Sequence, residues 1–161
     1  MNLDFNEIKT GQDFEELVVS YFKSLKEDKQ ILSVKVEPSG EGADGGRDIL
    51  VTFTLTDGID DFTRTWVVQC KFHQKSISPS KINDVNIPTL LHSYKASGYL
   101  LICRDGVTSK LSNMFEKLEK NCIFGHKYNF WTGSQFKRNF MRNKALLEQY
   151  FPEYYNSIKN N

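Results

Sequence analysis

A glycine-rich acidic loop that leads into two short alternating segments is the feature that most constrains the fold of this chain. The loop occupies 40–48 and reads Gly-Glu-Gly-Ala-Asp-Gly-Gly-Arg-Asp. An alternating segment follows at 49–55, a polar connection at 56–61, and a second alternating segment that ends in Gln-Cys-Lys at 69–71. An Asp-Gly pair between two such segments is typical of a β-hairpin. The sequence therefore predicts two antiparallel strands with polar residues at their open end.

Side chains of a strand point alternately to its two faces, so position alone sorts the residues of this hairpin. Asp48 lies on the less apolar face of the first strand, and Gln69 and Lys71 share one face of the second. A turn about Ile59 or Asp60 sets Asp48 across from Cys70 or Lys71. Directly paired residues have Cβ atoms roughly 4.5–5.5 Å apart. We therefore expect Asp48, Gln69 and Lys71 to contact one ion and one phosphate.

Magnesium fits such a group of side chains, because it binds oxygen ligands and keeps several waters beside one or two carboxylates. We expect Asp48 to supply charge, Gln69 its amide oxygen and Cys70 its backbone carbonyl, and we expect Mn²⁺ to be able to replace Mg²⁺. Lys71 would orient an attacking water and offset charge on the phosphate. Asp44 is a rival carboxylate, although a turn residue that bonds its own backbone is the favoured interpretation. The chemistry suits phosphodiester hydrolysis.

These residues resemble a known enzyme family. The sequence GADGGRD at 42–48, followed by the hairpin and Gln69-x-Lys71, is similar to the Mrr-type catalytic domain of the PD-(D/E)XK restriction-endonuclease superfamily. In that domain, glutamine replaces the usual acidic residue. The resemblance extends from Thr10 to about Phe130 and implies a restriction-endonuclease-like α/β fold, in which helices flank a central mixed sheet. Arg47 and the acidic hairpin connection depart from the family pattern, and neither is a proposed ligand.

An amphipathic helix is predicted just before this region, with Thr10 or Asp13 as its N-cap. Glu15 lies roughly 90° from the centre of its apolar stripe, whereas Glu16 lies nearly opposite the stripe. Glu15 can therefore reach the edge of a site. In the resembled family a glutamate that follows an aromatic residue of this helix assists metal binding, which makes Glu15 a candidate catalytic and metal-binding residue. The alternative is that Glu15 only stabilises the helix N-terminus.

Strands and helices alternate along the rest of the chain. Strands are predicted at 31–36, 98–103 and 128–131. A broken helical stretch is predicted at 80–96, with Pro88 opening its second part, and helices are predicted from 108 or 109 and from 134 onward. This order favours an α/β sandwich with a mixed sheet. The aromatic segment at 151–155 is expected to pack on the core or a partner rather than on bases.

Composition bounds the remaining choices. A chain of 161 residues suits one domain, and we expect a single nuclease domain over 1–161, with a core at about 10–131 and a C-terminal helix and aromatic tail at 132–161. Its three cysteines form neither a disulfide framework nor a zinc motif. Without a membrane-spanning apolar run or a signal-type N-terminus, it is expected to be cytoplasmic and to have no membrane partner.

A net charge of +1 gives no overall attraction to nucleic acid, so any such affinity must come from local clusters. The candidate nucleic-acid-binding residues are Arg47, His73, Lys75 and Lys81, which lie near the predicted site in sequence. A second basic group at 137–144 is interpreted as solvated surface charge.

These observations predict a metal-dependent DNA endonuclease that cuts double-stranded DNA with low sequence specificity. The resemblance implies a role in restriction or antiphage defence, alone or as an effector domain fused to a sensor or NTPase domain. Cutting both strands needs two sites, so we expect a homodimer or larger homo-oligomer. One alternative is a nucleic-acid-binding module that keeps the fold but has little activity. Another is a structural interaction domain without chemistry.

Overall fold

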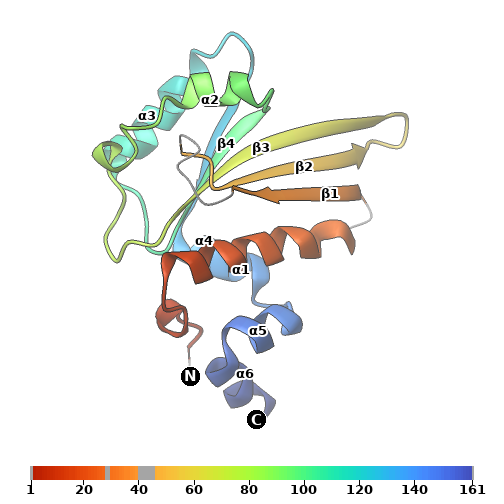
Figure 1. The fold of residues 1–161 in the computed structure, drawn as a ribbon, viewed down its shortest axis with the longest axis vertical. Helices are drawn as coiled ribbons and strands as arrows, with labels where there is room; N and C mark the ends of the chain where they lie inside the picture. Colours follow the sequence, from red (N-terminus) through yellow and green to blue (C-terminus); the bar gives the residue numbers. More distant parts are fainter. Residues whose placement is uncertain (1, 28–29, 40–45, 161) are drawn as a thin grey trace.

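The computed structural model describes residues 2–27, 30–39 and 46–160. Within these residues the strands form one five-stranded sheet in the order β1-β2-β3-β4-β5 (Figure 1). The strands are β1 (Ile31–Pro38), β2 (Ile49–Thr56), β3 (Asp61–Lys71), β4 (Gly98–Cys103) and β5 (Lys127–Trp131). The first three strands pair antiparallel, and β3, β4 and β5 pair parallel. The predicted α/β fold with a mixed sheet is confirmed.

Helices cover both faces of the sheet. α1 (Gly11–Ser24) lies on one face, whereas α2 (Ile87–Ser93) and α3 (Ser109–Lys120) lie on the other (Figure 1). The chain ends in α4 (Gly133–Phe140), α5 (Lys144–Tyr150) and α6 (Pro152–Lys159), and short 3₁₀ turns stand at Phe5–Glu7, Leu25–Glu27 and Pro79–Lys81. A separate apolar core fills each side of the sheet.

The alternation predicted for the hairpin is confirmed. Ile49, Val51 and Val68 are buried in the core between the sheet and α1. Val67 is buried in the second core, together with side chains of α2 and α3. The apolar residues thus fix which face of each strand every neighbouring polar side chain occupies.

The hairpin turn is one of the few places where the backbone needs a glycine. Gly58 has a φ of +89°, a value that glycine adopts without the steric cost other residues incur. The turn closes where the Asp57 N–H donates to the Asp60 carbonyl at 3.3 Å. The Asp57 carboxylate also accepts from the Ile59 N–H at 2.9 Å. The turn therefore centres slightly earlier in the chain than the sequence suggested.

This earlier turn changes the register at the open end of the hairpin. The pairing of β2 with β3 extends to place Asp48 across from Gln69, and the Asp48 N–H donates to the Val68 carbonyl at 3.0 Å. The expectation that Asp48 faces Cys70 or Lys71 was therefore wrong. Asp48 still lies at the end of β3 where the predicted polar residues stand.

The start of α1 follows the sequence prediction. The Thr10 hydroxyl accepts from the Asp13 N–H at 3.0 Å, and the Asp13 carboxylate accepts from the Thr10 N–H at 2.9 Å. Two N–H groups that the helix leaves unpaired are thereby satisfied by one reciprocal capping box. Both residues proposed as the N-cap take part, with Thr10 at the cap itself.

The end of the chain differs from the sequence prediction. A single helix was expected from Ser134 onward, and the structure has three short ones. Asn143 begins a new helix, because its side chain accepts from the Leu146 N–H at 3.2 Å. Pro152 begins the last helix, at a position where its missing N–H is tolerated. Caps in the middle of an apolar pattern therefore divided the predicted helix.

The aromatic segment after α5 packs on the core, as predicted. Phe151 is fully buried and stacks on Phe140, with ring centroids 5.4 Å apart. The Glu7 carboxylate accepts from the N–H groups of Glu153 and Tyr154 at 2.7 and 3.1 Å. These contacts attach α6 to the N-terminal segment, so the two ends of the chain stabilise one another.

The sequence predicted neither disulfide bonds nor a membrane-spanning segment, and both points can be examined in the described residues. Their three cysteines are free, and burial raises the pKa of Cys103 to about 12. No helix in the described part of the chain has the length and apolar character that a membrane crossing requires.

Substituting Phe151→Ala tests whether the aromatic segment belongs to the core. The change removes a fully buried ring, so we expect the free energy of unfolding to fall by about 3–5 kcal/mol. Urea denaturation followed by tryptophan fluorescence measures this. Ile158→Ala is the control, because Ile158 is 43% exposed and its loss should cost far less. Equal effects of the two substitutions would contradict core packing of the segment.

Candidate active site

Asp48 is held between two neighbouring strands. Its carbonyl accepts from the N–H and the hydroxyl of Ser39, at 2.8 and 3.0 Å. Its carboxylate Oδ2 accepts from the Cys70 N–H at 2.6 Å. The backbone of Asp48 is therefore fixed by hydrogen bonds to the end of β1 and to β3. Its side chain is fixed by the backbone N–H of Cys70, near the end of β3. Oδ1 is the oxygen left for other contacts.

Gln69 is the one buried polar residue among the described residues, with 4% of its surface exposed. Its Oε1 accepts a hydrogen bond from the Tyr99 hydroxyl. A buried amide without a partner would be costly, so Tyr99 stabilises Gln69 and orients it. Sequence reasoning missed Tyr99. The signal was present, because Tyr99 interrupts an otherwise aliphatic buried strand and shares its parity with the residues facing Gln69.

Lys71 is the last residue of β3 and is partly exposed. Its ammonium charge acts on Asp48, where it opposes the rise in the carboxyl pKa that burial causes. Burial is the largest effect on that pKa, and the Cys70 N–H also opposes it. The structure therefore brings Asp48, Gln69 and Lys71 together at the same end of the hairpin.

Glu15 joins this group from α1. It lines a cleft of about 380 Å³ together with Asp48, Ser39 and Tyr150. Burial raises the pKa of Glu15, and the negative charge of Asp48 raises it further. The capping box of Thr10 and Asp13 satisfies two N–H groups at the helix N-terminus without Glu15. The place of Glu15 in the cleft beside Asp48 favours a role in metal binding over a role that is limited to stabilising the helix N-terminus.

The donors around this cleft fit a hard divalent cation. Two half-buried carboxylates repel one another, and a cation between them would relieve that repulsion. The Cys70 carbonyl points to the same side of β3 as its N–H, hence toward Asp48. In the described part of the chain no three His, Cys, Asp or Glu side chains form a metal-binding group. The carboxylates of Asp48 and Glu15 line the cleft itself, whereas the Gln69 amide oxygen and the Cys70 carbonyl stand outside it at the neighbouring end of β3. Such a set of oxygens would suit an ion that retains waters.

The residues proposed to contact nucleic acid are more dispersed. His73, Lys75 and Lys81 are exposed in the segment that follows β3. Arg47 is half-buried, and its guanidinium packs over the Tyr94 ring at 4.7 Å from the centroid. The guanidinium of Arg47 thus packs on its own chain, whereas the other three residues are exposed. The predicted turn residue Asp44 lies outside the described residues.

A second cation near the site was not predicted. Arg104 follows β4, and its N–H donates to the Lys71 carbonyl at 3.0 Å. Its guanidinium packs over the Phe72 ring at 4.5 Å and donates to the Asn6 side chain at 3.1 Å. The sequence signal was its position as the first charged residue after an apolar parallel strand, where ligand sites gather in α/β sheets.

With this geometry known, comparison with known proteins identifies the family. The catalytic-domain model of the Mrr type, described as "Restriction endonuclease", matches residues 8–136. The chain belongs to this restriction endonuclease family. The predicted family is confirmed, and membership implies DNA endonuclease activity. No curated protein sequence matches the chain.

Two solved structures share the fold. The "DNA modification-dependent restriction endonuclease AspBHI" has a TM-score of 0.59 at 12% identity, over 97% of this chain and 37% of that one. The MspJI restriction endonuclease, solved in complex with a 27-mer oligonucleotide, has a TM-score of 0.53 at 13% identity, over 80% of this chain and 27% of that one. The chain thus spans little more than a third of the length of AspBHI and little more than a quarter of the length of MspJI.

The paired carboxylates predict a pH-dependent stability. Because the pKa of Glu15 is raised in the folded state, its contribution to stability is present below its ordinary pKa of 4.5 and is lost as the pH rises through the folded value. Glu15→Gln should therefore raise the melting temperature at pH 7 by roughly 1–3 °C, with the difference vanishing near pH 4.

Thermal melts across pH 4–8 in the absence of divalent ions measure this difference. Glu16→Gln is the matched control, since Glu16 is exposed on the same helix and should show no such trend. A lower melting temperature for Glu15→Gln at pH 7 would show that the two carboxylates do not repel each other in the folded chain.

Proposed function

We propose that this chain is a metal-dependent endonuclease that hydrolyses phosphodiester bonds in double-stranded DNA. The observation that carries the proposal is the convergence of Asp48, Lys71 and Glu15 from three separate elements on one end of the β2–β3 hairpin. Converging carboxylates beside a lysine are an arrangement for holding a cation next to a phosphate. Family membership supports the same activity.

Each residue has a role that follows from its surroundings. Asp48 and Glu15 would hold Mg²⁺, or Mn²⁺ in its place, together with the Gln69 amide oxygen and the Cys70 carbonyl. When bound, the ion would lower the pKa of a water and offset charge on the phosphate. Lys71 places its ammonium beside Asp48, where it can donate to a phosphate oxygen and orient the attacking water.

The surroundings of Gln69 support its role as a neutral ligand. The Tyr99 hydroxyl fixes the amide by a hydrogen bond to Oε1, and an amide oxygen can accept a second contact through its other lone pair. The Cys70 N–H occupies one oxygen of Asp48 and leaves the other for the ion. In this proposal the sheet thus orients the Gln69 amide and the Asp48 carboxylate before an ion binds.

DNA is the proposed partner. The exposed His73, Lys75 and Lys81 would contact backbone phosphates, which carry no sequence information. Low sequence specificity follows, in keeping with a cytoplasmic role in restriction or antiphage defence. Both structural neighbours are much longer proteins, which supports a catalytic unit that works with further domains such as a sensor or an NTPase. Cutting both strands requires two sites, so a homodimer or larger homo-oligomer is proposed.

Plasmid cleavage tests the proposal. Purified chain with Mg²⁺ should convert supercoiled DNA to nicked and then linear forms. Asp48→Ala and Lys71→Ala should each lower the rate at least about a hundredfold, because Asp48 would hold the ion and Lys71 would offset the charge on the reacting phosphate. Matched controls are Asp61→Ala and Lys35→Ala, two exposed residues of the strands outside the cleft, which should cut at the wild-type rate.

Cleavage that survives both substitutions would reject this site. The rival function, a nucleic-acid-binding module without activity, predicts another result. It should give salt-sensitive mobility shifts of DNA and no product in any divalent ion. One observation favours testing this alternative function. Among the described residues, no three acidic, histidine or cysteine side chains form a group that could hold a metal ion.

Metal binding can be measured without any cleavage. Mn²⁺ should raise the melting temperature of the wild-type chain at pH 7, because an ion that binds the folded state alone stabilises it. Asp48→Asn should abolish that rise and Glu15→Gln should reduce it. Titration calorimetry gives the corresponding affinities. An equal rise in the wild-type chain and in Asp48→Asn would place the ion elsewhere.

A further inference from the structure

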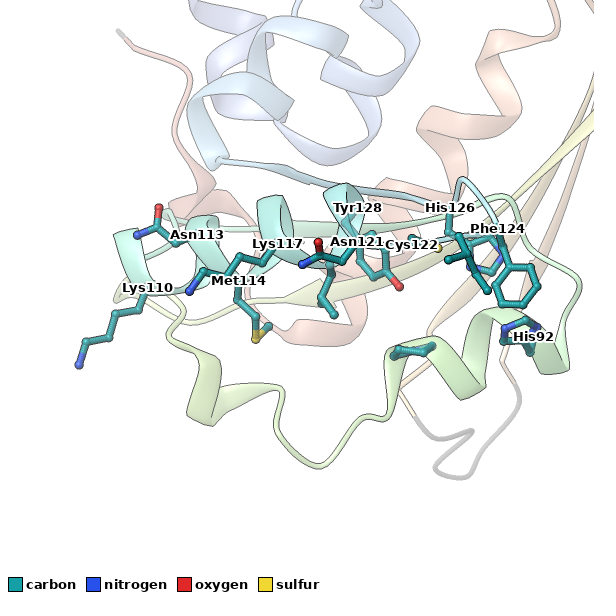
Figure 2. Close-up of a pocket in the computed structure, with 13 residues that line it drawn as sticks. His92, Lys110, Asn113, Met114, Lys117, Asn121, Cys122, Phe124, His126 and Tyr128 are labelled. Atoms are coloured by element: carbon teal, nitrogen blue, oxygen red, sulfur yellow. The ribbon is translucent and has the colours of Figure 1, made fainter.

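A second concave site lies on the opposite face of the sheet from Glu15. It is a groove of about 670 Å³ between α2, α3 and the segment that joins α3 to β5 (Figure 2). No acidic side chain is among the described residues that line it. Because α1 covers the other face of the sheet (Figure 1), this groove is separate from the proposed nuclease cleft.

The groove runs along α3, starting at the end of the sheet where the nuclease residues stand. Lys71 pairs with Cys103 at the C-terminal end of the parallel strands β3 and β4, and α3 begins a few residues later. Lys110 therefore stands at that end. Phe124 and His126 precede β5, which starts at the other end of the sheet. Figure 2 shows the same order, with Lys110 at one end of the groove and Phe124 at the other.

One side of the groove is polar and cationic. Residues three or four apart share a helix flank, and this flank of α3 carries two lysines and two amides, at Lys110, Asn113, Lys117 and Asn121. Met114 and Leu118 form its apolar floor. Cations with amides beside an apolar surface match the phosphates and base edges of a nucleic-acid strand.

The far end of the groove is aromatic. Phe124 is 63% exposed and its neighbour Ile123 is 89% exposed, so this end of the groove presents an apolar patch to solvent. The His92 ring stands at 89° to the Phe124 ring with centroids 4.8 Å apart, and the His126 ring lies at 28° to it at 5.8 Å. Burial and the neighbouring His92 both lower the pKa of His126. The end of the groove is therefore an aromatic platform in which the Phe124 ring is exposed to solvent.

We propose that this groove binds a single-stranded segment of nucleic acid, with phosphates along Lys110 and Lys117 and a base stacked on Phe124. Sequence-independent binding of single strands combines a cationic groove with aromatic stacking, and both are present here. The proposal goes beyond hydrolysis, since binding at this face needs neither Asp48 nor a divalent ion. Binding in this groove would keep an unpaired strand near the proposed nuclease site.

Fluorescence anisotropy with a short 5′-labelled oligothymidylate, recorded on the full chain in EDTA, tests the proposal. Phe124→Ala should weaken binding about fivefold or more, the usual cost of losing one base-stacking ring. Lys117→Ala should weaken binding and lower the slope of log affinity against log salt by about 0.7. Phe124→Tyr keeps a ring at this position and should bind as the wild-type chain does.

Two controls separate this groove from other sites. Lys120→Ala removes the same charge from the other flank of α3, beside Glu119 and outside the groove, and should change the affinity less than twofold. Asp48→Ala removes the proposed nuclease site and should also leave the affinity unchanged, so failure of the nuclease proposal would not affect this result.

Three results would overturn the inference. Equal affinities for Phe124→Ala and Lys120→Ala would show that the groove does not bind the strand. Loss of binding in Lys71→Ala with full binding in Phe124→Ala would place the strand in the nuclease cleft. Light scattering that shows a dimer disrupted by Phe124→Ala, with oligonucleotide affinity unchanged, would assign the exposed ring to a contact between two copies.

Discussion

The hydrogen bond from the Cys70 N–H to the Asp48 carboxylate is the contact on which the candidate site depends. It joins the residue that precedes β2 to the end of β3 at 2.6 Å. Asp48 lies one residue before β2, so the register of the hairpin decides which residues of β3 it meets. Because side chains alternate along a strand, a slip of one residue would turn Gln69 to the opposite face. The buried apolar residues of both strands prevent that slip.

The position of Glu15 depends on a different set of contacts. Phe14 is fully buried, and its ring centroid lies 5.2 Å from that of Phe72 and 5.9 Å from that of Phe136. Phe14 precedes Glu15, and Phe72 follows Lys71. The contact between these two rings therefore holds the start of α1 against the end of β3, and so holds Glu15 near Asp48. A core contact on one side of the sheet thus positions two charged residues at its edge.

The sequence indicated the fold and most of the cleft because those features depend on alternation and caps, which are local. Asp48, Gln69 and Lys71 were placed at one end of the hairpin by parity alone, and Thr10 was recognised as a cap. The exact partner of Asp48 was not predicted, since it depends on where the turn closes around Gly58. The division of the C-terminal helix at Asn143 was missed because a favourable cap competed with an unbroken apolar pattern. Tyr99 was missed because its hydroxyl meets Gln69 only after β4 pairs with β3.

The burial of Gln69 explains why a neutral amide can stand beside two carboxylates. A carboxylate at this position would add a third negative charge with 4% of the residue exposed. Burial and repulsion from Asp48 would then both raise its pKa and destabilise the chain without an ion. The amide avoids that repulsion and requires only one neutral donor, which the Tyr99 hydroxyl supplies. The carboxylates of Asp48 and Glu15 and the ammonium of Lys71 together carry one net negative charge, which attracts a cation.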